Sequence, residues 1–317
     1  MIPPVPSSER PTAAGRPTAA GRPTAAERPA AVDGLVVVDK PAGWTSHDVV
    51  ARSRRLLGTR RIGHAGTLDP MATGVLVLGV GRGTRLLGRL ALTAKVYEAT
   101  IRLGRTTTTD DAEGDPVADR PVDVGAGPLA AAMAELTGEI DQVPSSVSAV
   151  KVAGVRAYDR VRAGEEVTLA PRRVTVGRFE LLARRGETDL DVVVACSSGT
   201  YIRALARDLG AALGCGAHLT ALRRTEVGPF GLAEAVTLDA LAEAANAAVV
   251  PLGAAVAATF PRRDVDGEQA RDVAYGRRLP MLGSPGPYGV FGPDGALLAL
   301  FEERDGVARP IVVFAPA

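Results

Sequence analysis

The stretch GHAGTLDPMATG at residues 63–74 places a single carboxylate, that of Asp69, just ahead of the apolar stretch VLVLGV. Its three glycines allow the backbone to adopt positive φ and to approach a ligand closely, and Pro70 fixes the turn after Asp69. A carboxylate in such a rigid loop is placed to act on a substrate, for example by covalent addition. Asp-Pro also begins ordinary turns, so Leu-Asp-Pro by itself would favour a structural role.

A second stretch, CSSGTYIRALARDLG at residues 196–210, predicts a strand end, a glycine turn and a helix that begins near Thr200. Arg203 then lies in the first helical turn, where a cation opposes the helix dipole unless an anion faces it. The alternative is a surface arginine that is free or pairs with Asp208.

The stretch KVYEATIRL at residues 95–103 alternates mostly with period two, which predicts a half-buried strand with Tyr97 on the same face as Ala99 and Ile101. A tyrosine on an isolated strand most often packs in the core. Tyr97 is therefore a candidate site residue only in combination with Asp69 and Arg203.

Lysine is rare in this chain: three lysines, Lys40, Lys95 and Lys151, occur among 37 basic residues. This ratio suggests a GC-rich genome in which arginine replaces lysine wherever it can serve. A compact ammonium differs from a planar guanidinium, so the three remaining lysines are candidates for sites that do not accept arginine.

Charge is unevenly distributed, although the formal net charge is only +1. Residues 40–105 contain twelve Lys or Arg against three acids, whereas residues 106–145 contain one Arg against nine acids. A basic face that binds nucleic acid is therefore compatible with the neutral sum. The alternative is that arginines such as Arg52, Arg54 and Arg55, on one predicted helix, form an ordinary solvated surface.

The elements that must position these residues follow from periodicity and turn residues. The folded domain begins at Gly34 with a buried strand, and Ser46 is predicted to be the N-cap of a helix through Leu57. Further strands are predicted at 75–80, 95–103, 173–184, 189–196 and 219–227, and further helices from near Thr84 and at about 128–137, 157–163 and 200–213. Because strands and helices do not alternate regularly, the fold class is α+β rather than a doubly wound sheet.

Both ends of the chain differ from the middle. Residues 1–33 repeat the hexad RPTAAG without apolar periodicity, so we expect a disordered Arg/Pro/Thr/Ala tail. Residues 34–248 are expected to form the main domain. Residues 249–317 consist of short β-like stretches with Gly and Pro turns, which predict a small β-rich domain.

Length and composition favour a soluble enzyme, since 317 residues with 46% hydrophobic content can bury a substantial core. We find neither an apolar run of the about 18 residues that a transmembrane helix needs nor the apolar region of a signal peptide. Cys196 and Cys215 match no metal-ligand spacing or disulfide framework, so we expect buried, inert thiols and a cytoplasmic location.

Every fixed position of the pattern G-H-x-G-x-L-D-P-x-A-x-G occurs at residues 63–74, which therefore resemble the catalytic loop of the TruB family of tRNA pseudouridine synthases. Lys95-Val96-Tyr97 is similar to the K-x-Y strand of that family, and the resemblance covers about residues 34–232. It implies a mixed, mainly antiparallel pseudouridine-synthase sheet with a central cleft, followed by a PUA-like domain at 249–317.

The resemblance also implies roles for individual residues. Asp69 would be the nucleophile, Arg203 would orient it and keep it ionised, and Tyr97 would stack on the target uracil. TTTTDDAEGD resembles the family segment that ends T-x-x-D-A-x-G and places Asp111 in the same network, although the threonine run departs from the usual arrangement with an earlier acid. The implied substrate-binding residues are His64, Lys40, Lys95, Lys151, Leu222, Arg172 and Arg173. For His64 and Leu222, structural roles explain the chemistry equally well.

Residues from about 144 to 174 resemble the thumb-like insertion of the family and would supply Lys151, Arg156, Arg172 and Arg173 to RNA phosphates. We therefore expect affinity for RNA to fall steeply with salt, through counterion release.

The implied reaction detaches uracil from C1′ of its ribose and reattaches it through C5, so substrate and product are isomers. It would need no cofactor, metal or redox agent. The target would be the T-loop uridine, position 55, of tRNA, flipped out of its stack. Covalent addition of the carboxylate and glycal formation both remain open. We expect a monomer that contacts the T arm of tRNA, without a guide RNA or a membrane.

Three other functions are compatible with parts of the sequence. A tRNA-binding or tRNA-folding factor would need the RNA grip but not the chemistry, and an Asp69→Asn protein that still binds RNA would separate the two. A guide-RNA-dependent synthase is disfavoured by the short C-terminal region. A dinucleotide-binding oxidoreductase is suggested only by GVGRGT at residues 79–84, which lacks the third glycine at the required offset.

Overall fold

The computed structural model describes residues 32–145, 151–152, 155–156, 169–284 and 286–315. These residues all belong to one compact unit, Ala31–Ala317. Nearly all of the predicted tail at 1–33, the predicted helix at 157–163 and much of the thumb-like insertion lie outside the described residues.

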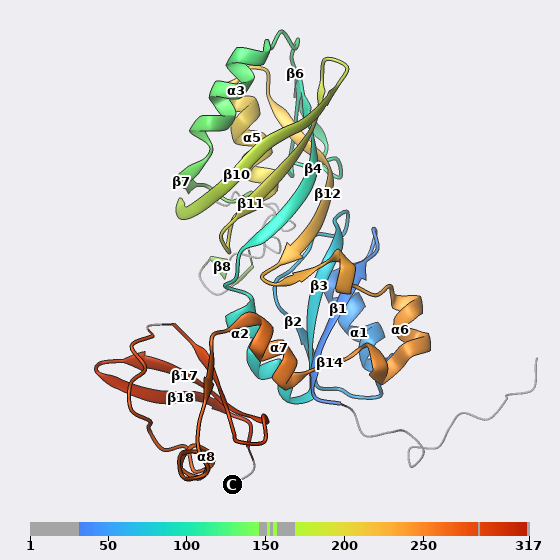
Figure 1. Ribbon diagram of the computed structural model, residues 1–317. Helices are drawn as coiled ribbons and strands as arrows, with labels where there is room; N and C mark the ends of the chain where they lie inside the picture. The colour runs from blue at the N-terminus through green and yellow to red at the C-terminus, as the bar shows by residue number, and fades with distance from the viewer. Residues whose placement is uncertain (1–31, 146–150, 153–154, 157–168, 285, 316–317) are drawn as a thin grey trace, which may run out of the picture. The chain divides into compact units, whose positions relative to one another are not determined.

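A ten-stranded sheet forms the main body of this unit (Figure 1). Its main path is β14 (Val250–Pro251), β1 (Gly34–Lys40), β3 (Thr73–Val80), β12 (Ala217–Val227), β4 (Lys95–Leu103), β11 (Asp189–Cys196), β10 (Arg172–Arg185) and β7 (Gly138–Gln142). Two short strands pair outside this path, β2 (Ile62–His64) with β3 and β13 (Phe230–Gly231) with β12.

The strand pairs of this sheet are antiparallel in the described residues, except at its centre. There β12 runs parallel to β3 over two residue pairs, Arg223 with Thr73 and Arg224 with Gly74. At Gly74 a β-carbon would lie 2.1 Å from the backbone oxygen of Arg224, so only glycine permits this close approach. The predicted mixed, mainly antiparallel sheet is confirmed.

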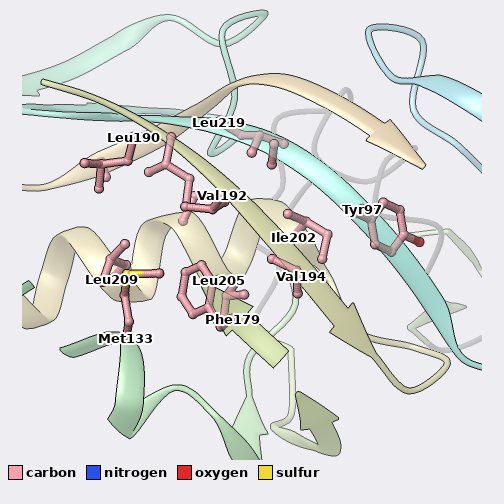
Figure 2. Close-up of a cluster of buried hydrophobic side chains, with 14 of the residues drawn as sticks. Tyr97, Met133, Phe179, Leu190, Val192, Val194, Ile202, Leu205, Leu209 and Leu219 are labelled. Atoms are coloured by element: carbon pink, nitrogen blue, oxygen red, sulfur yellow. The ribbon is translucent and has the colours of Figure 1, made fainter. Parts of the chain in front are cut away.

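Helices pack on both halves of the large sheet, and the last helix packs on a second sheet that follows it. They are α1 (Ser46–Leu56), α2 (Leu87–Leu90), α3 (Ala126–Glu135), α5 (Ile202–Ala212), α6 (Leu238–Ala244), α7 (Leu252–Thr259) and α8 (Gly267–Ala274), with 3-10 turns η1 (Gly81–Leu86), η2 (Leu232–Glu234) and η3 (Ala245–Ala248). Met133 of α3 and Leu205 and Leu209 of α5 pack in one buried cluster with β4, β10, β11 and β12 (Figure 2). Val50 of α1 and Leu241 of α6 pack in another with β1 and β3.

Sequence periodicity locates most of these elements. Burial alternates along β4 as predicted, with Tyr97, Ala99 and Ile101 buried on one face. The predicted strand at 189–196 coincides with β11. The helix predicted from near Thr84 is instead the 3-10 turn η1 followed by the single turn α2. Gly83 in η1 packs directly on β1, where a β-carbon would lie 2.0 Å from Gly34 O.

The predicted N-cap of α1 is wrong by one residue. Thr45 caps this helix through a capping box with Asp48: the Asp48 N–H donates to Thr45 Oγ1 at 3.1 Å, and Thr45 N–H donates to the Asp48 carboxylate at 2.9 Å. Ser46 is fully buried and bonds a distant loop instead. Both residues are good caps, so their order alone could not distinguish them.

A second, four-stranded sheet follows near the C-terminus, in the order β15 (Arg262–Asp264), β16 (Tyr288–Phe291), β17 (Leu297–Arg304) and β18 (Val307–Val313). It carries α8 and has its own core around Tyr288 and Phe301, which confirms the small β-rich region. The predicted domain border at 248–249 precedes β14, which still pairs with β1 of the large sheet.

Two small hairpins complete the structure, β5 (Arg105–Thr107) with β6 (Pro116–Asp119) and β8 (Lys151–Val152) with β9 (Val155–Arg156). None of the helices in the described residues is long and apolar enough to cross a membrane.

Candidate active site

The loop that carries Asp69 is held by side chains and backbone from outside it. Ser46 Oγ donates to Leu68 O at 3.1 Å and accepts from Leu68 N–H at 2.8 Å. One buried hydroxyl therefore hydrogen-bonds both backbone groups of the residue before Asp69. The backbone N–H of Gly43 donates to Pro70 O, the residue after Asp69, at 2.9 Å. Anchors on both flanks therefore fix the Asp69 backbone.

Lys40 is a third anchor of this loop. Its side chain is fully buried, and Nζ donates to the backbone oxygens of Pro41, Trp44 and Pro70 at 3.0, 2.6 and 3.1 Å. Burial lowers the pKa of Lys40 to about 8, and the Asp69 carboxylate opposes this shift. A compact ammonium fits among three carbonyls. The structure therefore supports a role in shaping the loop and offers no support for the expected direct contact with RNA.

Arg203 joins the two carboxylates that the sequence singled out. Its Nε lies 3.0 Å from Asp69 Oδ2, and its Nη1 lies 3.3 Å from Asp111 Oδ2. The side chains of Arg203 and Asp111 are each 5% exposed, whereas that of Asp69 is 36% exposed. The expected pairing of Arg203 with Asp69 is present, and of the two carboxylates Asp69 is the accessible one.

Asp111 is held in place by its own loop. Its Oδ1 accepts hydrogen bonds from Thr109 Oγ1 at 2.5 Å and from the backbone N–H of Glu113 at 3.0 Å, while Thr109 O accepts from Arg203 Nη1 at 2.8 Å. The threonine run that departs from the family pattern thus supplies contacts to both Asp111 and Arg203.

A cavity of about 250 Å³ opens beside Asp69. Tyr97 of β4, Leu222 of β12 and Tyr201 at the start of α5 line it together with Asp69 and Arg203. Tyr97 and Leu222 are each 8% exposed, and Tyr97 lies at one end of the buried cluster with its hydroxyl pointing away from it (Figure 2). The core and cavity roles weighed for these two residues are therefore compatible, because each side chain lies at the border of both.

Arg224 is a site residue that sequence reasoning missed. It is 1% exposed and lines the cavity, with Nε donating to Val75 O at 2.7 Å and Nη2 to Gly66 O at 3.1 Å. Burial raises the pKa of Tyr97, and the Arg224 cation opposes that shift. Residues two apart on a strand share a face, so the inward prediction for Leu222 could have revealed Arg224 as well.

Gln142 was also missed, and no local pattern signals it. Its side-chain amide donates from Nε2 to Tyr201 O at 3.1 Å and accepts at Oε1 from Tyr201 N–H at 2.8 Å. α5 has no side-chain cap of its own, so this 1% exposed glutamine fixes the backbone at the N-terminus of the helix that carries Arg203.

Lys95 lines the cavity but bonds inward. Its Nζ donates to Ala91 O and Thr93 O, both at 2.6 Å, and burial lowers its pKa to about 8, helped by Arg224. Cys196 beside it is a buried thiol whose pKa burial raises to about 11, in agreement with the expected inert cysteine.

His64, Arg172 and Arg173 are not among the described residues that line the cavity. His64 of β2 is half-buried 5.5 Å from the His47 ring, and burial followed by the His47 charge lowers its pKa. Arg172 is exposed at the start of β10, and Arg173 pairs with Glu139 and Asp141. The side chain of Lys151 lies outside the described residues.

The arrangement can present one partly exposed carboxylate, fixed by a buried cation, to a flat group that enters the cavity beside Tyr97 and Leu222. Among the described residues, no group of three or more His, Cys, Asp or Glu side chains is arranged to hold a metal ion.

Comparisons with known proteins agree with this geometry. The model described as "TruB family pseudouridylate synthase (N terminal domain)" matches residues 54–202, "tRNA pseudouridylate synthase B C-terminal domain" matches 203–251, and "tRNA Pseudouridine synthase II, C terminal" matches 260–315. The chain is similar to "tRNA pseudouridine synthase B" of Thermobifida fusca (strain YX), with 61% identity over 89% of this chain and 99% of that protein. It is similar to the protein of the same name from Nocardia farcinica (strain IFM 10152), with 60% identity over 89% and 94%.

Solved structures share the fold. "Crystal Structure of a Cbf5-Nop10-Gar1 Complex" superposes with a TM-score of 0.71 at 28% identity, over 89% of this chain and 85% of that one. "Crystal structure of the archaeal box H/ACA sRNP Nop10-Cbf5 complex" gives a TM-score of 0.66 at 28% identity, over 89% and 86%. On the strength of the family models and of these relatives, the chain belongs to the TruB family of pseudouridylate synthases.

Proposed function

We propose that the protein is a standalone tRNA pseudouridine synthase that isomerises the T-loop uridine, position 55, of tRNA. One observation carries the proposal: the partly exposed Asp69 carboxylate faces a cavity and is paired with the buried Arg203, which also pairs with the buried Asp111. Relatives named tRNA pseudouridine synthase B are 60–61% identical over nearly their whole length, which supports tRNA as the substrate.

In the proposed reaction the target uridine is flipped out of its stack into the cavity, at a cost of about a few kcal/mol. The bond between C1′ and N1 breaks, the uracil rotates, a bond forms between C1′ and C5, and the proton of C5 is lost as N1 gains one. Asp69 serves as the nucleophile or assists glycal formation. Tyr97 and Leu222 hold the two sides of the uracil, and Arg203 orients the carboxylate.

Partners and location follow from the same proposal. The protein acts in the cytoplasm as a monomer on the T arm of tRNA and uses no guide RNA. Its match to nearly the full length of relatives named as tRNA enzymes supports tRNA as the substrate. His64, Lys151, Arg172 and Arg173 contact the RNA around the cavity. The 34–248 and 249–317 regions act as catalytic and PUA-like domains.

The test is to incubate the purified protein with an unmodified tRNA transcript, in chelator and without cofactor, and to map pseudouridine by carbodiimide-dependent reverse-transcription stops. We expect a single stop in the T loop with the wild type and none with Asp69→Asn, which should still bind tRNA. Tight binding without any stop would instead indicate an RNA-folding factor or another substrate.

A further inference from the structure

The side chains of Arg52, Arg55 and Arg60, on α1 and in the loop that follows it, make no hydrogen bond or ion pair in the part of the chain that the structure describes. We call these three residues the α1 arginine group. Their neighbours Arg54 and Arg61 bond the uncharged oxygens Ile62 O and Thr84 Oγ1. Within ten residues of sequence, five guanidinium groups therefore have no ion-pair partner among the described residues.

The described carboxylates near this surface form no ion pair with the α1 arginine group. Asp48, one turn before Arg52, accepts from the Thr45 hydroxyl at 2.6 Å and from the Thr45 N–H at 2.9 Å. Asp33 pairs with Arg82 at 2.5 Å, although Arg61 also helps to lower its pKa. The helix packed beside α1, α6, carries acids as well, but the described residues contain no ion pair between α6 and the α1 arginine group.

Exposed arginines on the other half of the sheet are arranged differently. Arg102 pairs with Asp189, Arg185 with Asp191 and Arg178 with Glu180, all at 2.7 Å. Attraction to the helix dipole explains a cation such as Arg55 in the last turn of α1, but it does not explain Arg52 or Arg60. The α1 arginine group is therefore a local excess of positive charge that no ion pair within the described residues neutralises.

This surface begins next to the catalytic loop. Ser46, the first residue of α1, bonds Leu68, His47 lies 5.5 Å from His64 between ring centroids, and Arg54 bonds Ile62 O in β2. An RNA whose target base occupies the cavity has further phosphates beyond that nucleotide, and a cationic surface beside the loop can bind them.

We propose that the α1 arginine group binds backbone phosphates of the RNA substrate outside the cavity. The inference rests on the proposed function, since it takes RNA as the substrate. Phosphate contacts of this kind contribute affinity and position without reading sequence, and each one makes binding more salt-dependent.

The experiment compares two triple variants of equal charge change. Arg52→Gln, Arg55→Gln and Arg60→Gln remove the α1 arginine group, whereas Arg102→Gln, Arg178→Gln and Arg185→Gln remove three exposed arginines that are already paired. Affinity for an unmodified tRNA transcript is measured from about 50 to about 200 mM salt. Thermal melting checks that both variants are folded.

For the α1 variant we expect the Kd to rise ~10- to 30-fold at low salt and the slope of log affinity against log salt to become shallower by about 2 to 3, roughly one for each lost phosphate contact. The control variant should change the slope by less than about 1.

An unchanged slope in the α1 variant, or an equal change in both variants, would overturn the inference. Failure of the proposed function looks different: the wild type would then form no pseudouridine, while the affinities of the two variants could still be compared. If the wild type forms pseudouridine and the α1 variant binds tRNA as tightly as the wild type, the function stands and the inference fails.

Discussion

The loop around Asp69 and the hairpin of β10 and β11 both depend on charged side chains, but they use them in opposite ways. Around the loop, Lys40 and Arg224 are buried and donate to backbone oxygens. On the hairpin, Arg185 and Arg178 are exposed and pair with carboxylates. Exposed pairs of this kind contribute little to stability, whereas losing a buried donor leaves its acceptors unsatisfied. The role of a charge thus depends on what it contacts and not on its sign.

Removing the buried Arg224 should have the strongest consequence. Arg224→Met leaves Val75 O and Gly66 O without their side-chain donor, so the free energy of unfolding should fall by about 2–4 kcal/mol. Pseudouridine formation should fall more than ~10-fold, because the loop that carries Asp69 loses an anchor. Urea unfolding and single-turnover assays measure the two effects.

The matched control is Arg178→Met, which removes an exposed guanidinium and its pair with Glu180. We expect neither its urea midpoint nor its turnover to change. Similar losses in both variants would show that burial does not separate the two regions.

A smaller effect is expected at the start of α1, where two neighbouring hydroxyls have different roles. Ser46→Ala removes both hydrogen bonds to Leu68 and should cost about 1–3 kcal/mol, with a clear loss of turnover. Thr45→Ala removes the helix cap and should cost about 1 kcal/mol, with turnover unchanged. Unfolding curves and turnover of both variants test this difference, and equal turnover in the two would refute the positioning role of Ser46.

The weakest effect that we predict is a pH dependence of stability that arises from the buried Lys40. The pKa of Lys40 is about 8 in the folded protein and 10.5 ordinarily, so burial disfavours its charged form. Below pH 8 both states are protonated and the penalty is complete, whereas between pH 8 and 10.5 the folded state releases its proton first. Stability should therefore rise with pH in this window relative to Lys40→Met, in which this titration is absent.

Unfolding free energies of the wild type and Lys40→Met at about pH 7 and about pH 10 provide the measurement. Using the difference between the two proteins removes the opposing titration of groups such as Cys196, whose folded pKa is raised to about 11. The unfolding free energy of the wild type minus that of Lys40→Met should increase with pH. A value that stays constant or falls as pH rises would contradict the assignment.

The sequence predicted the residues that meet at the cavity better than the residues that support them. Asp69 and Arg203 lie in compact motifs, and the alternation of β4 was enough to turn Tyr97 inward. Ser46, Gln142 and Arg224 instead act on residues 22, 59 and 158 positions away. Such contacts depend on which strands become neighbours, and period-two patterns carry no information about pairing between distant strands. The insertion of β12 between β3 and β4 is a pairing of that kind.

That insertion has a consequence for the order in which a ribosome delivers the chain. Asp69, Tyr97 and Arg203 are all synthesised before β12. This strand lies between β3, which follows the Asp69 loop, and β4, which carries Tyr97. It supplies Leu222 and Arg224 to the cavity. Long-range pairing is slow and must wait for its last partner. A chain that ends after Arg203 and before about residue 217 would contain Asp69, Tyr97 and Arg203 and would still lack the strand that completes the cavity. Catalytic competence therefore arises late in synthesis, as one event and not by degrees.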